Sequence, residues 1–223
     1  LDLYGKARKQ GGAVDMGAIE SSHKKAPVLK SNEIVYVKSG SNGDGTSWET
    51  AFGDVPQAIF SSSADGKKHQ IWVATGTYYG DTTLSTVVNL APGISLYGGF
   101  AGNEKSLAAR DTANNPTIID GKSQRRVITQ NYGFADSMAV VVDGFTIQNG
   151  NMANGGGAYL STNTTINNCI IKSNKASENG SAIYATNATI KNCQIIGNTY
   201  TNSLQYTVRL NNCKMDSCVL KGN

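Results

Sequence analysis

A segment of about 24 residues repeats itself through the C-terminal third of this chain. Residues 164–174 (TTINNCIIKSN) match residues 188–198 (ATIKNCQIIGN) at an offset of 24, and residues 213–223 (CKMDSCVLKGN) follow at an offset of 25. A repeat this short cannot bury a hydrophobic face alone, so successive copies must stack on one another. The sequence therefore predicts a solenoid.

Within each copy, apolar residues lie two apart, which is the alternation of a β-strand with one buried face. A period of 23–25 residues with Gly and Asn at the turns is too short for a propeller blade and lacks leucine-rich spacing. It favours an all-β, right-handed parallel β-helix of about seven rungs over residues 70–223. The predicted inward column is Val73, Leu96, Ile119, Val142, Ile166, Ile190 and Met215.

Three further columns are expected to stack along the solenoid beside a column of Ile147, Ile171, Ile195 and Leu220. Four cysteines are too few for a scaffold held by disulfides, and parallel Cβ vectors in stacked strands disfavour the disulfide dihedral. We therefore expect small, buried, free thiols in the first column and an asparagine hydrogen-bond ladder in the third. The columns are Phe145, Cys169, Cys193 and Cys218; Tyr159, Ile183 and Val208; and Asn174, Asn198 and Asn223.

Residues 31–69 break the repeat and form a second predicted region. Residues 33–38 predict a strand, residues 39–47 a loop, and residues 54–60 a short helix with Asp54 as N-cap and Pro56 in its first turn. A helix just before the first rung is expected to close the open end of the core. Residues 1–30 form a separate tail.

The charge distribution excludes one class of partner. The net charge is +4, but residues 1–30 carry six basic and three acidic residues, so the remaining chain is nearly neutral. No broad cationic face for nucleic acid is expected.

No run of 18 apolar residues exists, so no transmembrane segment is predicted. Residues 1–20 are too polar for a signal peptide and the chain begins without Met, so we expect a trimmed start that lacks the export signal.

Several segments resemble a known group of proteins. Residues 36–48 (YVKSGSNGDGTSW), 71–78 (IWVATGTY) and 96–104 (LYGGFAGNE) resemble bacterial right-handed parallel β-helix surface proteins of the pectin-lyase-like superfamily. Residues 180–183 (GSAI) and 195–198 (IIGN) resemble the GGAI and FxxN signatures of polymorphic outer membrane protein repeats. The resemblance covers residues 34–223 and implies a β-helix secreted to, or held on, the surface of a Gram-negative bacterium. It implies no single activity, because the superfamily holds lyases, hydrolases and adhesins.

The tail has a resemblance of its own. Residues 1–8 (LDLYGKAR) and 13–20 (AVDMGAIE) resemble the D-x-x-G-x-x-R…D-x-G-A-x-E segment that ends such β-helices in the choice-of-anchor class. Residues 1–22 are then the end of a preceding module or a displaced cap. In the isolated chain this segment would either fold back along the outer face of the coil or reach the last rung of another molecule; the second alternative gives head-to-tail association through residues 1–22.

Two carboxylates are candidates for catalysis. Asp120 and Asp143 are predicted to share a column, and adjacent rungs about 4.8 Å apart could bring them near the ~5–5.5 Å spacing of a retaining glycosidase. The alternative is that both are turn residues placed before glycine. Lys122, Arg125 and Arg126 could neutralise and deprotonate a uronate in a lyase, or could simply belong to a solvated loop. The Asn-Thr-Asp, Asp-Asp and Gly-His-Gly signatures of the superfamily's hydrolases do not occur in this sequence.

Other candidates concern metal and ligand binding. Asn42 and Asp44 lie in a loop whose sequence is similar to a calcium-binding loop, but the spacing of its residues is wrong for an EF-hand. The two alternatives are that this loop binds calcium in an irregular geometry and that the protein has no cofactor. Trp72 is predicted to face outward, where residues 26–37 either cover it or leave a ligand surface. In the second case four aromatic side chains could stack on sugar rings: Trp72, Tyr78, Tyr79 and Tyr97.

Two functions of different classes remain open. The first is a non-catalytic cell-surface module for adhesion to a host surface, glycan binding or spacing. The alternative is a polysaccharide lyase or glycoside hydrolase acting on an acidic or host glycan. An enzyme needs a groove with converging carboxylates or basic side chains, whereas a spacer needs none.

Overall fold

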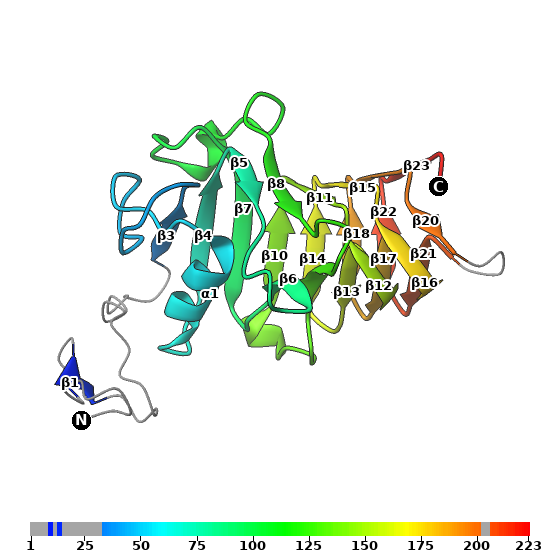
Figure 1. Cartoon of the computed structure of the whole chain (residues 1–223), viewed down its shortest axis with the longest axis horizontal. Coiled ribbons are helices and arrows are strands. Elements are labelled where there is room, and N and C mark those ends of the chain that lie inside the picture. Colours follow the sequence, from blue (N-terminus) through cyan, green and yellow to red (C-terminus); the bar gives the residue numbers. More distant parts are fainter. Residues whose placement is uncertain (1–8, 11–12, 15–32, 202–205) are drawn as a thin grey trace.

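The computed structural model describes residues 9–10, 13–14, 33–201 and 206–223, and its body is a parallel β-helix of about six turns (Figure 1). Each complete turn contributes one strand to each of three long parallel sheets that run along the solenoid, whereas the first and last turns are incomplete. The first sheet contains β3 (Ile34–Val37), β4 (His69–Ala74), β7 (Ile94–Phe100), β10 (Val140–Asp143), β14 (Thr164–Asn167), β18 (Thr189–Lys191) and β22 (Lys214–Asp216).

The second and third sheets complete the cross-section, with a small fourth sheet beside them. The second contains β5 (Gly76–Tyr78), β8 (Thr117–Asp120), β11 (Phe145–Gln148), β15 (Ile170–Lys172), β19 (Gln194–Ile196) and β23 (Val219–Lys221). The third contains β6 (Thr86–Asn89), β9 (Arg126–Thr129), β13 (Ala158–Leu160), β17 (Ile183–Thr186) and β21 (Val208–Asn211). The fourth contains β12 (Asn151–Asn154), β16 (Lys175–Asn179) and β20 (Thr199–Tyr200).

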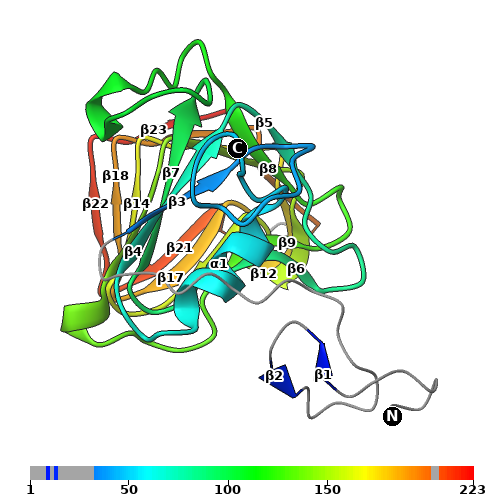
Figure 2. The same cartoon turned by 90° about the vertical axis from the view of Figure 1, so that its left-hand side faces the viewer.

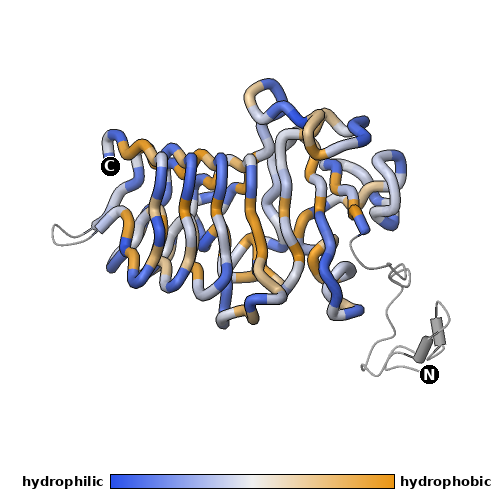
Figure 3. Tube along the Cα trace, turned by 180° about the vertical axis from the view of Figure 1, so that it is seen from behind, coloured by the Kyte–Doolittle hydropathy of each residue, from blue (hydrophilic) through white to orange (hydrophobic). Residues whose placement is uncertain are grey.

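Alternate side chains of these strands fill the inside of the coil, as strand geometry requires. Figure 3 shows hydrophobic and hydrophilic stretches alternating along each turn. In the first sheet the register joins Leu96 to Val142, Val142 to Ile166, and Ile166 to Ile190, and these residues are fully buried. The parallel β-helix and its main inward column are therefore confirmed.

The predicted column is wrong at two positions. Ile119 lies in the second sheet, opposite Ile147, and the residue opposite Leu96 is Ile71 rather than Val73. The cause of the first error is the segment 101–116, which lies between β7 and β8 and contains the 3-10 helix η1 (Leu107–Ala109). This insertion makes the 23 residues from Leu96 to Ile119 cover part of one turn instead of a whole one.

The other predicted columns are confirmed with two corrections. All four cysteines are free thiols, as predicted, and Cys169 and Cys193 are buried. The predicted burial of Cys218 is wrong, because this residue of the last turn is only half-buried. The residue opposite Ile183 is Ala158, so Tyr159 is displaced by one position. It faces outward, where its ring stacks on that of Tyr184 with the centroids 5.0 Å apart.

A helix closes the N-terminal end of the core, as expected (Figure 2). α1 (Val55–Ser63) begins where the Asp54 carboxylate accepts a hydrogen bond from the Val55 amide at 2.9 Å, and Pro56 lies in its first turn. Its apolar face contacts β3, β4, β6 and β7. The buried residues on that face include Val55, Ala58 and Ile59.

Two smaller points complete the fold. The strands β1 (Lys9–Gln10) and β2 (Ala13–Val14) pair antiparallel; apart from this pair, the predicted tail segment 1–22 lies outside the described residues. A 3-10 helix, η2 (Asp136–Met138), precedes β10. Among the described residues, no helix combines the length and the apolar character that crossing a membrane requires.

Candidate ligand-binding groove

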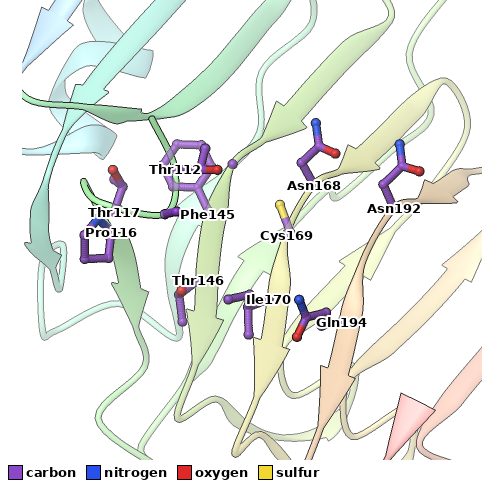
Figure 4. Close-up of a pocket in the computed structure, with 12 residues that line it drawn as sticks. Thr112, Pro116, Thr117, Phe145, Thr146, Asn168, Cys169, Ile170, Asn192 and Gln194 are labelled. Carbon is purple, nitrogen blue, oxygen red and sulfur yellow. The ribbon is translucent and has the colours of Figure 1, made fainter. Parts of the chain in front are cut away.

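A groove of about 280 Å³ lies along the corner between the first and second sheets (Figure 4). One side is the row of turns that join the two sheets, the floor is the outer face of the second sheet, and one end is closed by the segment 101–116. The lining residues are Thr112, Ala113, Pro116, Thr117, Gly144, Phe145, Thr146, Asn168, Cys169, Ile170, Asn192 and Gln194.

The turns at this corner require a left-handed backbone. Gly144 has φ of +81°, Asn168 of +50° and Asn192 of +53°. Glycine and asparagine adopt this conformation at the lowest cost, which explains why they recur at the corner. Asn168 and Asn192 are exposed. Their side-chain nitrogens donate, respectively, to the Asp143 carboxylate at 3.4 Å and to the Asn167 side-chain oxygen at 2.9 Å, so the turns present an amide oxygen on each of two successive rungs.

The floor of the groove is a row of outward side chains. Thr146 lies opposite Ile170, and Ile170 lies opposite Gln194, one residue per rung. Neighbouring rungs are about 4.8 Å apart. The row therefore offers an aliphatic side chain, Ile170, that is 37 % exposed and the exposed amide of Gln194 at a regular spacing, whereas Thr146 is only 9 % exposed.

The end wall is a short turn with its own hydrogen bonds. The Asp111 amide donates to the Gly99 carbonyl at 2.8 Å. The Asp111 carboxylate accepts from the amides of Ala113 at 3.0 Å and Asn114 at 3.1 Å. These bonds hold Thr112 and Ala113 at the edge of the groove.

The chemistry of this lining is uncharged. It supplies hydroxyls and amides, which both donate and accept hydrogen bonds, together with a few apolar side chains. Sites for small ligands commonly combine such an apolar surface with a few polar groups that fix orientation. The lining suits a neutral ligand rich in hydroxyl groups.

The two candidate catalytic carboxylates do not share a column. Asp120 ends β8 in the second sheet and lies opposite Gln148, whereas Asp143 ends β10 in the first sheet and lies opposite Asn167. The prediction that adjacent rungs bring them together is wrong, again because the segment 101–116 shifts the count.

Both carboxylates are buried and engaged. Asp120 accepts hydrogen bonds from the Gln148 amide at 2.7 Å, the Asn149 amide at 2.8 Å and the Lys122 backbone at 2.7 Å. Asp143 forms an ion pair with Arg110 at 2.6 Å. These partners give each carboxylate a structural role, consistent with the interpretation as turn residues.

The three basic candidates point to separate partners. Lys122 is exposed, and its ammonium lies 4.1 Å from the centroid of the Tyr79 ring. Arg125 is buried and donates to the carbonyls of Tyr79 and Asp81.

Arg126 contacts the turn of the coil that follows its own. It donates to the carbonyls of Gly155 at 3.0 Å and Asn154 at 2.7 Å, and burial lowers the pKa of its guanidinium. None of the three basic residues lines the groove.

The aromatic candidates divide into buried and exposed residues. Trp72 is only 3 % exposed and belongs to a second hydrophobic cluster outside the coil, with Trp48, Ala74 and Phe100. Its ring stacks on Phe100 with the centroids 4.7 Å apart. The predicted cover by residues 26–37 is confirmed for Ile34 and Tyr36, which pack against this cluster; residues 26–32 lie outside the described part. Phe100 and Trp48 complete the cluster, and Trp48 contacts the rings of Tyr36 and Phe100.

Tyr78 points inward, so it cannot offer its ring to a ligand. Its hydroxyl donates to the Ala74 carbonyl at 2.9 Å, and burial raises its pKa to about 12. Tyr79 is 40 % exposed beside Lys122, and Tyr97 is half-buried under the Arg110 guanidinium. The structure does not bring these tyrosines together in one surface.

The candidate calcium loop is organised by its own hydroxyls. The Asp44 carboxylate accepts from the Thr46 hydroxyl at 2.8 Å and the Thr46 amide at 3.1 Å, and these bonds lower its pKa. Asn42 is exposed. Among the described residues, no group of three or more acidic, histidine or cysteine side chains is placed to hold a metal ion.

Sequence reasoning missed the residues that line the groove. The signal was present in the repeat itself, because Asn168 and Asn192 precede the aligned cysteines in residues 167–169 (NNC) and 191–193 (KNC). We identified that pattern only as a turn. The end wall from the segment 101–116 had no repeat to reveal it.

Comparison with known proteins assigns the chain to a family but to no activity. No curated protein and no solved structure matches it significantly. The family model of DUF1565, described as a protein of unknown function, matches residues 38–220, which is most of the chain, and the chain therefore belongs to the DUF1565 family.

Proposed function

We propose that this chain is a non-catalytic β-helix module that binds a neutral glycan in the groove at the corner of the first and second sheets. The observation that carries the proposal is the groove lining, which combines the exposed amides of Asn168, Asn192 and Gln194 with the exposed Thr112 hydroxyl and the partly exposed Ile170 side chain, and which contains no ionisable carboxylate or base. Hydroxyl groups of a sugar can both donate to and accept from such side chains.

The spacing of the polar groups supports an extended ligand. The amides of Asn168 and Asn192 recur on successive rungs, as do Thr146, Ile170 and Gln194. A polymer lying along the solenoid would meet one outward side chain of this row at each step of about 4.8 Å. The resemblance to β-helix surface proteins favours a place on the cell surface, where such a module would serve adhesion or act as a spacer.

The arrangement of carboxylates favours binding over cleavage. Asp120 and Asp143 lie in different sheets, and each is held by hydrogen bonds or an ion pair. A glycosidase needs two carboxyl groups flanking the scissile bond. These two carboxylates are poorly arranged for that chemistry.

A glycan array followed by mass spectrometry of the bound sugar tests both parts of the proposal. We expect retention of one or more neutral oligosaccharides with unchanged mass. Gln194→Ala should weaken binding by about tenfold, equivalent to the loss of roughly 1.4 kcal/mol. The matched control is Gln124→Ala, at an exposed glutamine outside the lining. Shortened products would contradict the non-catalytic assignment, and equal binding by both variants would exclude the groove as the site.

A further inference from the structure

One charged side chain connects the end wall of the groove to the solenoid beneath it. Figure 1 shows the segment 101–116 as a green loop that extends beyond the coils beside β8. Arg110 lies in this segment, just before the turn that carries Thr112 and Ala113. Its side chain is 16 % exposed and that of Asp143 is 7 % exposed, so their ion pair is largely shielded from water.

The contacts of Arg110 reach two neighbouring turns of the coil. Its Nη2 atom lies 2.6 Å from the Asp143 carboxylate, and its Nη1 atom donates to the Gly98 carbonyl at 3.3 Å. The guanidinium lies 5.6 Å from the centroid of the Tyr97 ring. Asn167 donates to the second carboxylate oxygen of Asp143, which fixes the acceptor in place.

Two glycines in the turns beneath the end wall leave room for the segment 101–116. A Cβ atom added at Gly144 would lie 2.8 Å from the Thr112 methyl and 3.0 Å from Arg110 Nη1. A Cβ atom added at Gly99 would lie 2.5 Å from the same methyl. Glycine at both positions therefore allows the segment to pack directly on the corner.

We infer that Arg110 is a positioning residue: its ion pair with Asp143 holds the segment 101–116 in place as the end wall of the groove. Arg110 does not line the groove, so it acts through Thr112, Ala113 and Pro116. Its effect on ligand affinity rests on the proposed function, whereas its effect on the wall does not. A planar guanidinium suits this role because it donates in several directions at once.

Amide hydrogen exchange measures how readily the end wall opens, and it does so without any ligand. The reporters are the amides of Asp111, Ala113, Asn114 and Asn115, which are hydrogen-bonded in the structure. We expect Arg110→Gln and Asp143→Asn each to accelerate their exchange by about tenfold or more. Arg110→Lys should give a smaller increase, because it keeps the charge but loses the planar fork. Lys105→Gln, at an exposed lysine of the same segment, is the matched control.

A double-mutant cycle separates positioning from general destabilisation. If the two side chains act through one ion pair, Arg110→Gln combined with Asp143→Asn should accelerate exchange little more than either change alone. Additive effects, or exchange at the control rate in Arg110→Gln, would overturn the inference.

The binding affinity of the same variants is then measured for the oligosaccharide that the unmodified chain binds on the array. Arg110→Gln should bind more weakly by about tenfold, equivalent to roughly 1.4 kcal/mol. If the unmodified chain binds no glycan, the proposed function fails, and the exchange data alone decide the role of Arg110. Normal glycan binding by a variant whose wall exchanges rapidly would overturn the effect on affinity.

Discussion

The side-chain nitrogen of Asn174 lies 3.0 Å from the side-chain oxygen of Asn198, the residue at the same place in the next turn of the coil. Asn198 in turn donates to Asn223 at 3.0 Å and to the Ile171 carbonyl at 2.9 Å. Asn174 and Asn198 are fully buried, and each also bonds main-chain groups: the Asn174 side chain accepts from the Gly150 amide and donates to the Ile147 carbonyl, and the Asn198 oxygen accepts from the Asn174 amide.

We expect Asn198→Asp to lower the free energy of unfolding by about 2–4 kcal/mol. The substitution keeps the shape but places a carboxylate against the oxygens of Ile171 and Asn223, which leaves buried acceptors without a donor. Urea unfolding measures the change. Asn211→Asp, at an exposed asparagine of β21, is the control. Equal stability of the two variants would show that the ladder contributes little.

Trp48→Ala should destabilise the protein by about 3–5 kcal/mol, because Trp48 covers the outward cluster formed with Trp72 and Phe100. The two tryptophans of the chain both belong to this cluster. Fluorescence of the folded variant should therefore shift to the red, as water reaches Trp72. Phe60→Ala, at a phenylalanine that is 78 % exposed, should change stability by less than about 0.5 kcal/mol. An unshifted emission maximum would contradict this account of the cover.

Alkaline stability should depend on Tyr78, whose pKa is raised to about 12 by burial despite the hydrogen bond from the Ser39 amide. Because the folded state disfavours the ionised form, its stability contribution is complete below the ordinary tyrosine pKa of about 10 and is lost as the pH rises from about 10 to about 12.

Tyr78→Phe should reduce this alkaline loss of stability while costing about 1–2 kcal/mol at neutral pH, where Ser39 and Ala74 lose a partner. Urea unfolding between pH 7 and pH 12 measures both effects. Tyr132→Phe is the control, since Tyr132 is 62 % exposed. If both variants lose stability as steeply as the unmodified chain, Tyr78 does not control the alkaline limit.

The thiols should react in the order of their exposure. Denatured, unreduced protein should titrate with four thiols, because all four cysteines are free. In the folded protein, half-buried Cys213 should be alkylated well before Cys169, where burial raises the pKa and excludes the reagent. Peptide mapping by mass spectrometry measures the order. A mass lower by two hydrogens would indicate a disulfide instead.

The sequence predicts the later turns of the coil better than the earlier ones. Ile166, Ile190 and Met215 were placed correctly because each turn there has nearly the same length and the same strand pattern. Residues 117–120 (TIID) and 140–143 (VVVD) have the same pattern too, yet they lie in different sheets. Alternation identifies a strand, but it does not say which side of the coil the strand occupies.

The groove could be predicted only in part for a related reason. The exposed amides of Asn168 and Asn192 belong to the repeat and were available to sequence analysis. The end wall belongs to an insertion without periodicity, and its position depends on the Arg110–Asp143 ion pair, which joins residues 33 apart in the chain. The contribution of Trp48 to the outward cluster was also not predictable, because Trp48 lies in a loop whose position is fixed by tertiary contacts and leaves no regular signal in the sequence.

The asparagine ladder also constrains how the length of such a protein can change. Asn174 and Asn198 are 24 residues apart, and Asn198 and Asn223 are 25 apart. Removing or adding one whole repeat would keep every buried amide opposite another and every apolar side chain inside. Removing half a repeat would bring strands of one side against strands of another, and would leave a buried asparagine facing a hydrophobic residue. Viable length variants of these later coils should therefore differ by whole turns, so that the solenoid lengthens or shortens in steps of about 4.8 Å.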